Sequence, residues 1–384
     1  MHKSILYSFL FLFAGIGVQA QLTVTTAGSL NVARWMHESQ VLPNGNVIAF
    51  GGDNGDLVST VVLKSAESYN PGSNSWSLVA NMNKERTDFA SAVLHDGRVM
   101  AIGGSDQAFT TLSSCEVYDY NTNTWTGLAS LNEPRAYHKA VKLKDGRVLV
   151  VGGNSNTNTA EVYDPYSNTW QYTDTLNKRH GSGIAATLLN DGRVLVTGGT
   201  GASNSLEIYN PVNNSWTQVG NNLITGRSYH NMSVMTDGTV FITAGESTHK
   251  KTEMFIPSTS QIFSNGNLQT AFGDCRTIVM DDGKVLIYGI GDFMAPSNTK
   301  CLETLASPSY TWTAGTYNFI GADSYCINKL RNGQVLIPGG RFTTGNGATT
   351  NCKLIGIASY SGCVTLDLNL TIGVTNVSYP KTTT

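Results

Sequence analysis

The chain has 384 residues, of which only 14% are charged, and its formal net charge is −2 at pH 7. This near-neutral charge gives no electrostatic reason to expect nucleic acid or an anionic membrane surface as a partner. The 40 glycines, together with many asparagine, serine and threonine residues, indicate a turn-rich all-β protein rather than a helical or disordered one.

The first 20 residues have the three parts of a secretory signal peptide. The start Met1-His-Lys3 is followed by an apolar run from Ile5 to Val18 and by the small-residue exit Val18-Gln-Ala20. The apolar run is too short to span a bilayer comfortably, which argues against a transmembrane anchor, and we expect no membrane span elsewhere. We therefore predict a secreted, cell-surface or periplasmic protein whose mature chain begins near Gln21.

Seven tight turns follow at nearly regular intervals of 52, 49, 46, 46, 45 and 50 residues. Asp-Gly or Asn-Gly between two apolar runs is a strong hairpin signal, because the turn needs a positive φ that glycine adopts without strain. The turns are Asn44-Gly45, Asp96-Gly97, Asp145-Gly146, Asp191-Gly192, Asp237-Gly238, Asp282-Gly283 and Asn332-Gly333.

Three further signals repeat with the turns, namely a Gly-Gly pair, a Glu-x-Tyr element and a tryptophan. In repeat four they are Gly198-Gly199, Glu207-Ile-Tyr209 and Trp216. Each unit of about 48 residues therefore contains four short strands, as expected for one blade of a propeller.

This pattern resembles the kelch repeat, whose blade has a hydrophobic run ending in Gly-Gly, then a tyrosine and then a tryptophan. Repeats five and six lack some of these residues, and repeat seven retains only the stretch from Asn332 to Gly340. The resemblance implies an all-β, seven-bladed kelch-type β-propeller with four antiparallel strands per blade. We expect it to span residues 21–362, followed over residues 363–384 by a C-terminal tail or a strand of the last blade.

Two segments are candidates for the strand that completes the last blade. Leu22–Thr26 aligns with the fourth strand of repeat two, with Val24 opposite Trp125, whereas Cys363–Leu368 follows the seventh repeat. A propeller with unjoined ends would expose sheet edges and apolar blade faces to water. We favour the N-terminal strand because of its alignment.

An arginine stands eleven residues before the turn glycine in several repeats. The members are Arg34, Arg86, Arg135 and Arg227, with Arg179 two residues further away in its repeat. They lie where the chain passes from one blade to the next, and the donors of a guanidinium suit backbone carbonyls at such a junction. An anion-binding ring is the alternative. Three residues after some of these arginines lie His37, His138 and His230, whose spacing does not predict a metal site.

The six cysteines allow up to three disulfides in an oxidising compartment, although their spacing does not determine the pairing. Buried thiols are the alternative. The cysteines are Cys115, Cys275, Cys301, Cys326, Cys352 and Cys363.

The sequence contains no complete catalytic signature of the common hydrolase, phosphate-binding or zinc classes. Asp53 and Asp56 flank a turn that could hold calcium, but acidic turns of this kind are commonly solvated loops. We therefore predict no catalytic residue, no metal and no cofactor.

Galactose oxidase and its relatives are copper enzymes on a kelch-type propeller, and some residues here resemble their copper site. Tyr229-His230 looks like that family's Tyr-His segment, while Cys275 and Tyr325 occupy equivalent positions in neighbouring repeats. The order along the chain differs from that family, however, and its remaining histidine comes from a domain after the propeller. The exported bacterial sialic acid epimerases resemble the chain in size and secretion, but no site residue can be matched to theirs.

Loop lengths predict where a ligand binds. The link between the second and third strands is long in repeats seven, one, two and six, so these loops would form one continuous sector of one face. Binding residues concentrate on loops held by a rigid scaffold, and aromatic or arginine side chains can stack on sugars or anchor peptides. The candidates are Phe109, Phe293, Arg341 and Phe342.

Taken together, these features predict a secreted, non-catalytic kelch β-propeller that binds or displays protein or glycan ligands on its loop face. The alternative is an exported enzyme on the same fold, either a copper radical oxidase of the galactose oxidase kind or a sialic acid epimerase. The sequence leaves the oligomeric state open.

Overall fold

The computed structural model describes residues 22–55, 59–153, 158–245, 250–268, 274–281, 283–290, 301–306, 311–315, 326–340 and 347–357. All secondary-structure elements in these ranges are β-strands, which confirms the predicted all-β class. Within the same ranges, no helix has the length and apolar character needed to cross a membrane. The predicted signal peptide, residues 1–20, and the segment 363–384 lie outside them.

Six antiparallel sheets each consist of four strands that are consecutive in the chain, and we number them as blades one to six. Blades one to three contain β2 (Glu38–Val41), β3 (Val47–Phe50), β4 (Ala66–Asn70), β5 (Ser75–Val79), β6 (Ala90–Val93), β7 (Val99–Ile102), β8 (Cys115–Asp119), β9 (Thr124–Leu128), β10 (Lys139–Lys142), β11 (Val148–Val151), β12 (Ala160–Asp164) and β13 (Thr169–Tyr172). Blades four to six contain β14 (Ala185–Leu188), β15 (Val194–Thr197), β16 (Leu206–Asn210), β17 (Ser215–Gln218), β18 (Asn231–Val234), β19 (Val240–Thr243), β20 (Lys251–Ile256), β21 (Gln261–Asn267), β22 (Asp274–Val279), β23 (Val285–Ile290), β24 (Cys301–Ala306) and β25 (Thr311–Gly315).

A further four-stranded sheet, which we call the terminal sheet, combines strands from both ends of the described chain. Its strands are β1 (Leu22–Ala27), β26 (Asn328–Lys329), β27 (Val335–Ile337) and β28 (Cys352–Ile357), in the order β1-β28-β27-β26. The N-terminal strand therefore completes the sheet of the last repeat, as its alignment predicts. The competing segment Cys363–Leu368 lies outside the described residues.

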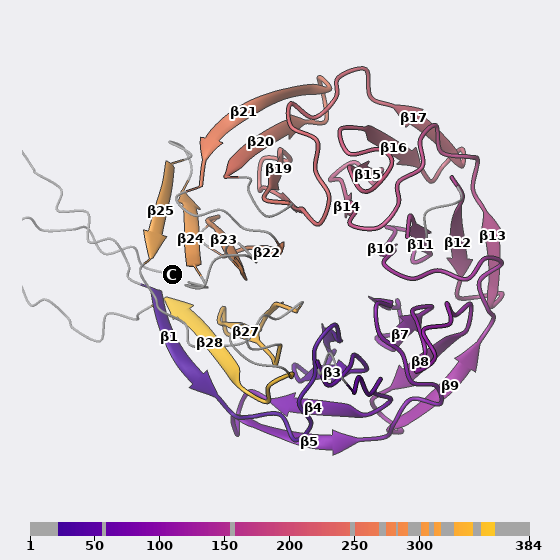
Figure 1. Cartoon of the computed structure of the whole chain (residues 1–384), viewed down its shortest axis with the longest axis vertical. Helices are drawn as coiled ribbons and strands as arrows, with labels where there is room; N and C mark the ends of the chain where they lie inside the picture. Colours follow the sequence, from indigo (N-terminus) through magenta and orange to yellow (C-terminus); the bar gives the residue numbers. More distant parts are fainter. Residues whose placement is uncertain are drawn as a thin grey trace, which may run out of the picture. The chain divides into compact units, whose positions relative to one another are not determined.

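Within the compact unit Val24–Gly356, the blades form a propeller in which they follow one another around a common centre (Figure 1). The first strand of each blade is innermost. Neighbouring inner strands contact one another from β2 through β6, β10, β14 and β18 to β22, and β26 of the terminal sheet contacts β2. The starts of these inner strands therefore converge on the centre.

The core lies between the blades and is built mainly by the second strand of each. In β3, β7, β11, β15 and β19 every residue is buried, because one face packs on the preceding blade and the other on the following blade. Ile48 and Phe50 of blade one, for example, share a hydrophobic cluster with Val99 and Trp125 of blade two. These strands consequently read as uninterrupted apolar runs rather than as alternating patterns.

A buried arginine fixes the connecting segment between successive blades, as predicted. The guanidinium of Arg86 donates to the carbonyls of Gly103 and Ser114 at 2.6 and 3.0 Å and pairs with Glu116 at 2.8 Å. Its backbone carbonyl accepts from the amide of Gly52 in the preceding blade at 2.9 Å. The same residue thus links two blades, and Arg34, Arg135 and Arg227 make equivalent contacts.

Repeat four departs from the arginine pattern. Arg179 is exposed, and the neighbouring His180 takes the buried position, contacting the carbonyl of Gly198 at 2.7 Å and the carboxylate of Glu207 at 3.2 Å. The assignment of Arg179 to the junction was therefore wrong. A histidine can bridge the same two acceptors because its ring nitrogens lie on opposite sides.

Four of the six cysteines have described side chains, and all four are buried thiols rather than members of disulfides: Cys115, Cys275, Cys326 and Cys352. Burial raises the pKa of Cys115 and of Cys326 to about 12 and that of Cys352 to about 11. Three disulfides are therefore not formed, and these thiols act as small apolar core residues. The side chains of Cys301 and Cys363 lie outside the described part.

Candidate functional site

A cavity of about 320 Å³ lies where the inner strands begin, and we call it the axial pocket. Five strands that are far apart in the sequence contribute to it: Glu38 and Gln40 from β2, Ser91 from β6, Lys139 from β10, Asn231 from β18 and Arg276 from β22. Ile184, just before β14, adds blade four. Because each inner strand starts at the same end of its blade, side chains from six blades meet in one place.

One position, two residues before the inner strand, lines the pocket in five successive blades. Its members are Met36, Asp88, Tyr137, Gly183 and Tyr229, and all of them have positive φ, between 49° and 76°. This conformation is strained for residues other than glycine and persists only where the surroundings impose it. The backbone turn therefore holds a side chain of blades one, two, three and five at the pocket, whereas blade four has a glycine at this position.

The next residue of each segment points into the blade junction instead. His37, Phe89, His138, Ile184 and His230 are buried there. An added Cβ at Gly103 or Gly153 would lie 3.0–3.1 Å from atoms of His138, so the glycine pairs leave the room that these side chains occupy. Burial lowers the pKa of His138 and of His230 to about 3. These histidines are therefore neutral packing residues.

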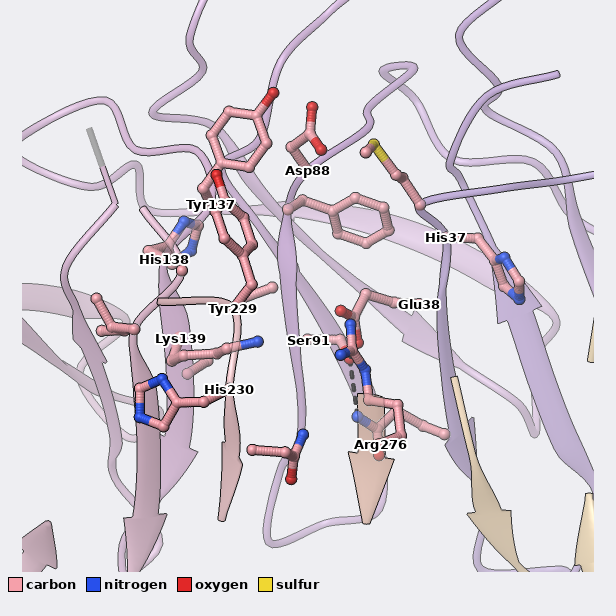
Figure 2. Close-up of a pocket in the computed structure, with 18 residues that line it drawn as sticks. His37, Glu38, Asp88, Ser91, Tyr137, His138, Lys139, Tyr229, His230 and Arg276 are labelled. Carbon is pink, nitrogen blue, oxygen red and sulfur yellow. Dashed lines mark hydrogen bonds between the residues drawn. The ribbon is translucent and has the colours of Figure 1, made fainter. Parts of the chain in front are cut away.

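The deeper part of the pocket, which we call the floor, contains a carboxylate among cations. Glu38 accepts a hydrogen bond from the hydroxyl of Ser91 at 2.7 Å, and Gln40 donates to that hydroxyl at 2.8 Å. Burial raises the pKa of Glu38, and the nearby charges of Lys139 and Arg276 partly oppose this rise. Figure 2 shows the ammonium of Lys139 directed toward the space that Glu38 and Arg276 also face.

The opposite part of the pocket, which we call the mouth, contains Asp88 and two tyrosines (Figure 2). Tyr137 and Tyr229 are 43% and 44% exposed. Burial raises the pKa of Asp88 to about 6, although a hydrogen bond from the Tyr137 hydroxyl favours the carboxylate. Asp53 lies close enough to raise the pKa of Asp88 further, while its own carboxylate accepts from the amide of Gly55 at 2.7 Å.

Of the four site residues predicted from the loops, only Phe109 lies in the described part. It is 63% exposed in the β7–β8 loop. Phe293, Arg341 and Phe342 lie outside the described residues. The structure does not bring Phe109 into the axial pocket lining.

The predicted adjacency of the long loops holds for three of them. Gln107 in the loop of blade two accepts from the amide of Val62 at 2.7 Å and donates to the carbonyl of Thr60 at 2.8 Å, both in the loop of blade one. The carbonyl of Asn54 in that loop accepts from the amide of Ala348, before β28, at 2.6 Å. These loops leave the same end of the blades at which the axial pocket lies.

Sequence reasoning missed Asp88, Tyr137, Glu38, Lys139 and Arg276. For Asp88, Tyr137, Glu38 and Lys139, the position shortly after a repeated arginine could have identified them, because the arginine recurs whereas the residue two positions before the inner strand changes. Arg276 has no such signal, because its repeat lacks the arginine. A variable position inside a repeating framework indicates that the framework does not determine its residue.

The residues that resemble a copper site do not converge in the described structure. Tyr229 lines the pocket, but the ring of His230 is buried between blades, with Nε2 2.6 Å from the hydroxyl of Thr197. The thiol of Cys275 is buried, and Tyr325 lies outside the described residues. No group of three or more histidine, cysteine or acidic side chains in the described ranges is arranged to hold a metal. The described members of this set therefore do not form a copper centre.

Comparisons with known proteins agree on the repeat and the fold. The KLHDC2/KLHL20/DRC7 Kelch-repeats domain matches residues 17–199, and the Kelch motif matches residues 185–223. No curated protein matches the chain. Among solved structures, the chain is similar to a fungal alcohol oxidase of the AA5 family in complex with copper, with a TM-score of 0.68 and 17% identity. The match covers 88% of this chain and 76% of the oxidase, and at this identity it shows the fold alone.

Proposed function

Because the chain is a kelch-repeat β-propeller of the kind also found in galactose oxidase-like proteins, we propose that it is a non-catalytic module that binds a protein or glycan ligand at the axial pocket. The observation that carries this proposal is the convergence of six blades on one cavity, with side chains there that the repeat does not require. Concave sites with a few polar groups on a rigid scaffold are the usual places for ligands.

The chemistry of the pocket suits a ligand with both polar groups and a flat or apolar part. Glu38, Lys139 and Arg276 can accept or donate hydrogen bonds to hydroxyl, amide or carboxylate groups. Tyr137 and Tyr229 add half-exposed rings on which a sugar ring or an aliphatic side chain can pack.

We propose that the long loops of blades one and two and the segment before β28 extend this binding surface. The contacts that Gln107 and Ala348 make with the loop of blade one support a continuous rim beside the pocket. We include Phe109, Phe293, Arg341 and Phe342 in the rim. Changing Phe293 and Phe342 to alanine should weaken binding while leaving the thermal midpoint nearly unchanged, and full binding by this variant would remove them from the site.

A ligand screen with matched variants tests the proposed function. The mature chain is applied to a glycan array and, immobilised, to extracellular proteins, in parallel with the double variant Asp88→Asn/Lys139→Met, which changes both ends of the pocket, and with the surface control Tyr166→Ala. Tyr166 is 84% exposed in the β12–β13 hairpin and takes no part in the pocket. We expect a ligand that the native chain and the control retain and that the double variant binds at least tenfold more weakly. Equal binding by all three would contradict a role for the pocket.

Metal analysis of the purified protein tests the enzyme alternative. The binding-module proposal expects no stoichiometric copper, because the described residues do not form a copper centre. About one copper per chain would overturn it in favour of an oxidase.

We also propose that the chain is exported and that residues 1–20 are removed, which the three-part N-terminal pattern supports. Intact-mass spectrometry of the exported protein should give a start within two residues of Gln21. Material that retains Met1 to Ala20 would contradict the proposal.

Finally, we propose that the terminal sheet acts as a seventh blade and closes the ring. Its support is the hydrophobic cluster that joins Leu336 and Leu354 of this sheet to Val47 and Trp76 of blade one. A crystal structure in which the terminal sheet does not also adjoin blade six would contradict a closed seven-bladed ring.

A further inference from the structure

The two ends of the axial pocket differ in charge. The mouth contains the carboxylate of Asp88, with the buried Asp53 close by, whereas the floor contains Lys139 and Arg276 around Glu38. The only cations among the lining residues lie at the floor. A ligand group therefore meets negative charge and tyrosine rings first.

We propose that the mouth of the axial pocket binds an alkylammonium group, and specifically the side chain of a lysine presented by a protein partner. This inference rests on the proposed binding function and names its ligand. Aromatic faces attract cations through their quadrupole, and a nearby carboxylate adds charge attraction. Tyr137, Tyr229 and Asp88 supply these two elements from three different blades (Figure 2).

The backbone keeps these side chains in place before a ligand arrives. Asp88, Tyr137 and Tyr229 share the positive-φ turn, and the amide of Tyr137 donates to the carbonyl of Asp88 at 2.8 Å. The amide of Tyr229 similarly donates to the carbonyl of Gly183 at 2.7 Å. A site whose groups are already positioned loses less conformational entropy on binding.

The floor determines how far a cation can enter. A lysine ammonium that passed beyond Asp88 would approach Lys139 and Arg276, which carry the same charge. The attractive region is therefore confined to the mouth. The four-carbon stem of a lysine can pack along the half-exposed tyrosine rings while its ammonium reaches Asp88.

The surroundings of the mouth favour a protein over an amino sugar as the source of the ammonium. Val61 and Phe109, which are 50% and 63% exposed, lie in two neighbouring loops that Gln107 joins. An aliphatic and an aromatic side chain exposed in neighbouring loops match the apolar contacts of protein interfaces. An amino sugar would offer hydroxyl groups to this rim instead.

Saturation-transfer NMR with short synthetic probes tests the proposal, because it detects direct contact even for weak ligands. The probes are a capped peptide with one central lysine, the same peptide with acetyl-lysine, and a trimer of glucosamine. We expect the lysine ε-methylene protons to receive the strongest transfer, with at least a fivefold smaller signal for acetyl-lysine. An acetyl-lysine signal equal to that of lysine would overturn the cation site, and a stronger signal from glucosamine would overturn the protein partner.

Two substitutions should abolish the lysine signal without unfolding the chain. Asp88→Asn removes the charge and keeps a residue that tolerates positive φ, and Tyr229→Gly reproduces the residue that blade four has at Gly183. Tyr166→Ala is the control and should retain the signal. If both pocket variants bound the lysine peptide as the native chain does, the assignment of the mouth would be wrong.

The pH dependence of lysine-peptide binding provides an independent test of the proposal. The titratable groups around Asp88 are the hydroxyl of Tyr137 and the carboxylate of Asp53, with Tyr229 beside Tyr137 and Lys139 at the floor. Protonation of Asp88 near pH 6 would remove the negative charge that attracts the ammonium. We expect affinity for the lysine peptide to fall at least fivefold between pH 7.5 and pH 5.0 in the native chain. An affinity independent of pH would contradict the role of Asp88.

The two proposals fail in different ways. A ligand from the screen that loses binding in the double variant but competes with no lysine peptide would leave the binding module intact and refute only the cation site. Absence of any pocket-dependent ligand in the screen, together with absence of a lysine signal in NMR, would refute both proposals.

Discussion

At the scale of single residues, one position in each blade junction shows how packing determines ionisation. Phe89, Ile184 and His138 occupy equivalent places between glycine pairs. Neither ring nitrogen of His138 has a hydrogen-bond partner within the described structure. A histidine at this place therefore contributes bulk, as phenylalanine and isoleucine do, but it can also be protonated.

His138→Phe should make the protein more resistant to acid. The pKa of His138 is lowered to about 3 in the folded state, from 6.5, so its contribution to stability is complete above pH 6.5 and is lost as the pH falls toward 3. At pH 4.5 the native chain should lose about 2 to 3 kcal/mol through this residue. Urea titrations at pH 7.5 and 4.5 should show a smaller pH-dependent loss in the variant, and equal losses would contradict a neutral buried histidine.

Asp88 should have the opposite effect on stability. Burial raises its folded-state pKa to about 6, from 3.8, so the folded chain binds the proton more tightly and loses stability as the pH rises from 4 to 6. Asp88→Asn should therefore be more stable than the native chain at pH 7.5, by about 3 kcal/mol, and nearly equal to it at pH 4. Thermal unfolding at both pH values checks this. A variant less stable at pH 7.5 would show that the Asp88 carboxylate stabilises the fold.

At the scale of elements, the connecting segment between blades is the repeated structural unit. Arg86 reaches two carbonyls and Glu116 in its own blade, while its carbonyl accepts from Gly52 in the blade before. The carboxylate of Glu116 also accepts from the amide of Asn83 at 2.7 Å. The buried ion pair is therefore hydrogen-bonded on both sides, which is the condition under which burial of charge is tolerated.

Arg86→Leu should lower the free energy of unfolding by about 3–5 kcal/mol, because it leaves the buried Glu116 charge uncompensated. Arg86→His copies the arrangement of His180 and Glu207 in blade four and should lose less. Arg98→Ala, which removes an exposed pair with Asp96, is the matched control and should cost at most about 1 kcal/mol. Denaturant titration of the three variants gives the comparison, and an unaffected Arg86→Leu would show that the junction does not depend on the pair.

The strand β1 should also contribute to stability. It lies beside β28 in the terminal sheet, and Ala27 and Leu30 join the cluster between this sheet and blade one. Deleting Leu22–Thr26 should lower stability by several kcal/mol, since it exposes both the edge of β28 and part of this cluster. Calorimetry of the shortened mature chain measures the effect. An unchanged melting temperature would indicate that another segment can replace β1.

At the scale of the whole molecule, the sequence predicts the framework better than the site. The turn dipeptides, the glycine pairs and the Glu-x-Tyr elements recur because each blade packs in the same way, so the four-stranded blades, the junction arginines and the role of β1 could all be predicted. The prediction that Arg179 lies in the junction was wrong, because its repeat is longer and His180 contacts the equivalent acceptors instead. Spacing alone cannot show which of two adjacent polar residues becomes buried.

The site could not be predicted in the same way, because convergence around an axis is not visible in one dimension. Glu38 and Arg276 are 238 positions apart and line one cavity. The sequence predicts the aromatic loop residues as ligand contacts because of their residue type. No signal within their own segments predicts Asp88 and Tyr137 as site residues. Only the ring of blades brings them together.

The pairing of β1 with β28 has a consequence for the order of events during synthesis. The hydroxyl of Thr26 and the ammonium of Lys353, 327 positions apart, lie 3.4 Å from each other. A ribosome releases the first of these residues long before the second, so the earliest strand to emerge has no neighbour until the chain is almost finished. Contacts of such high sequence separation form slowly, and a strand edge that waits for its partner is prone to intermolecular pairing. We therefore expect β1 to pair with β28 only in the last step of folding, after the intervening blades have formed.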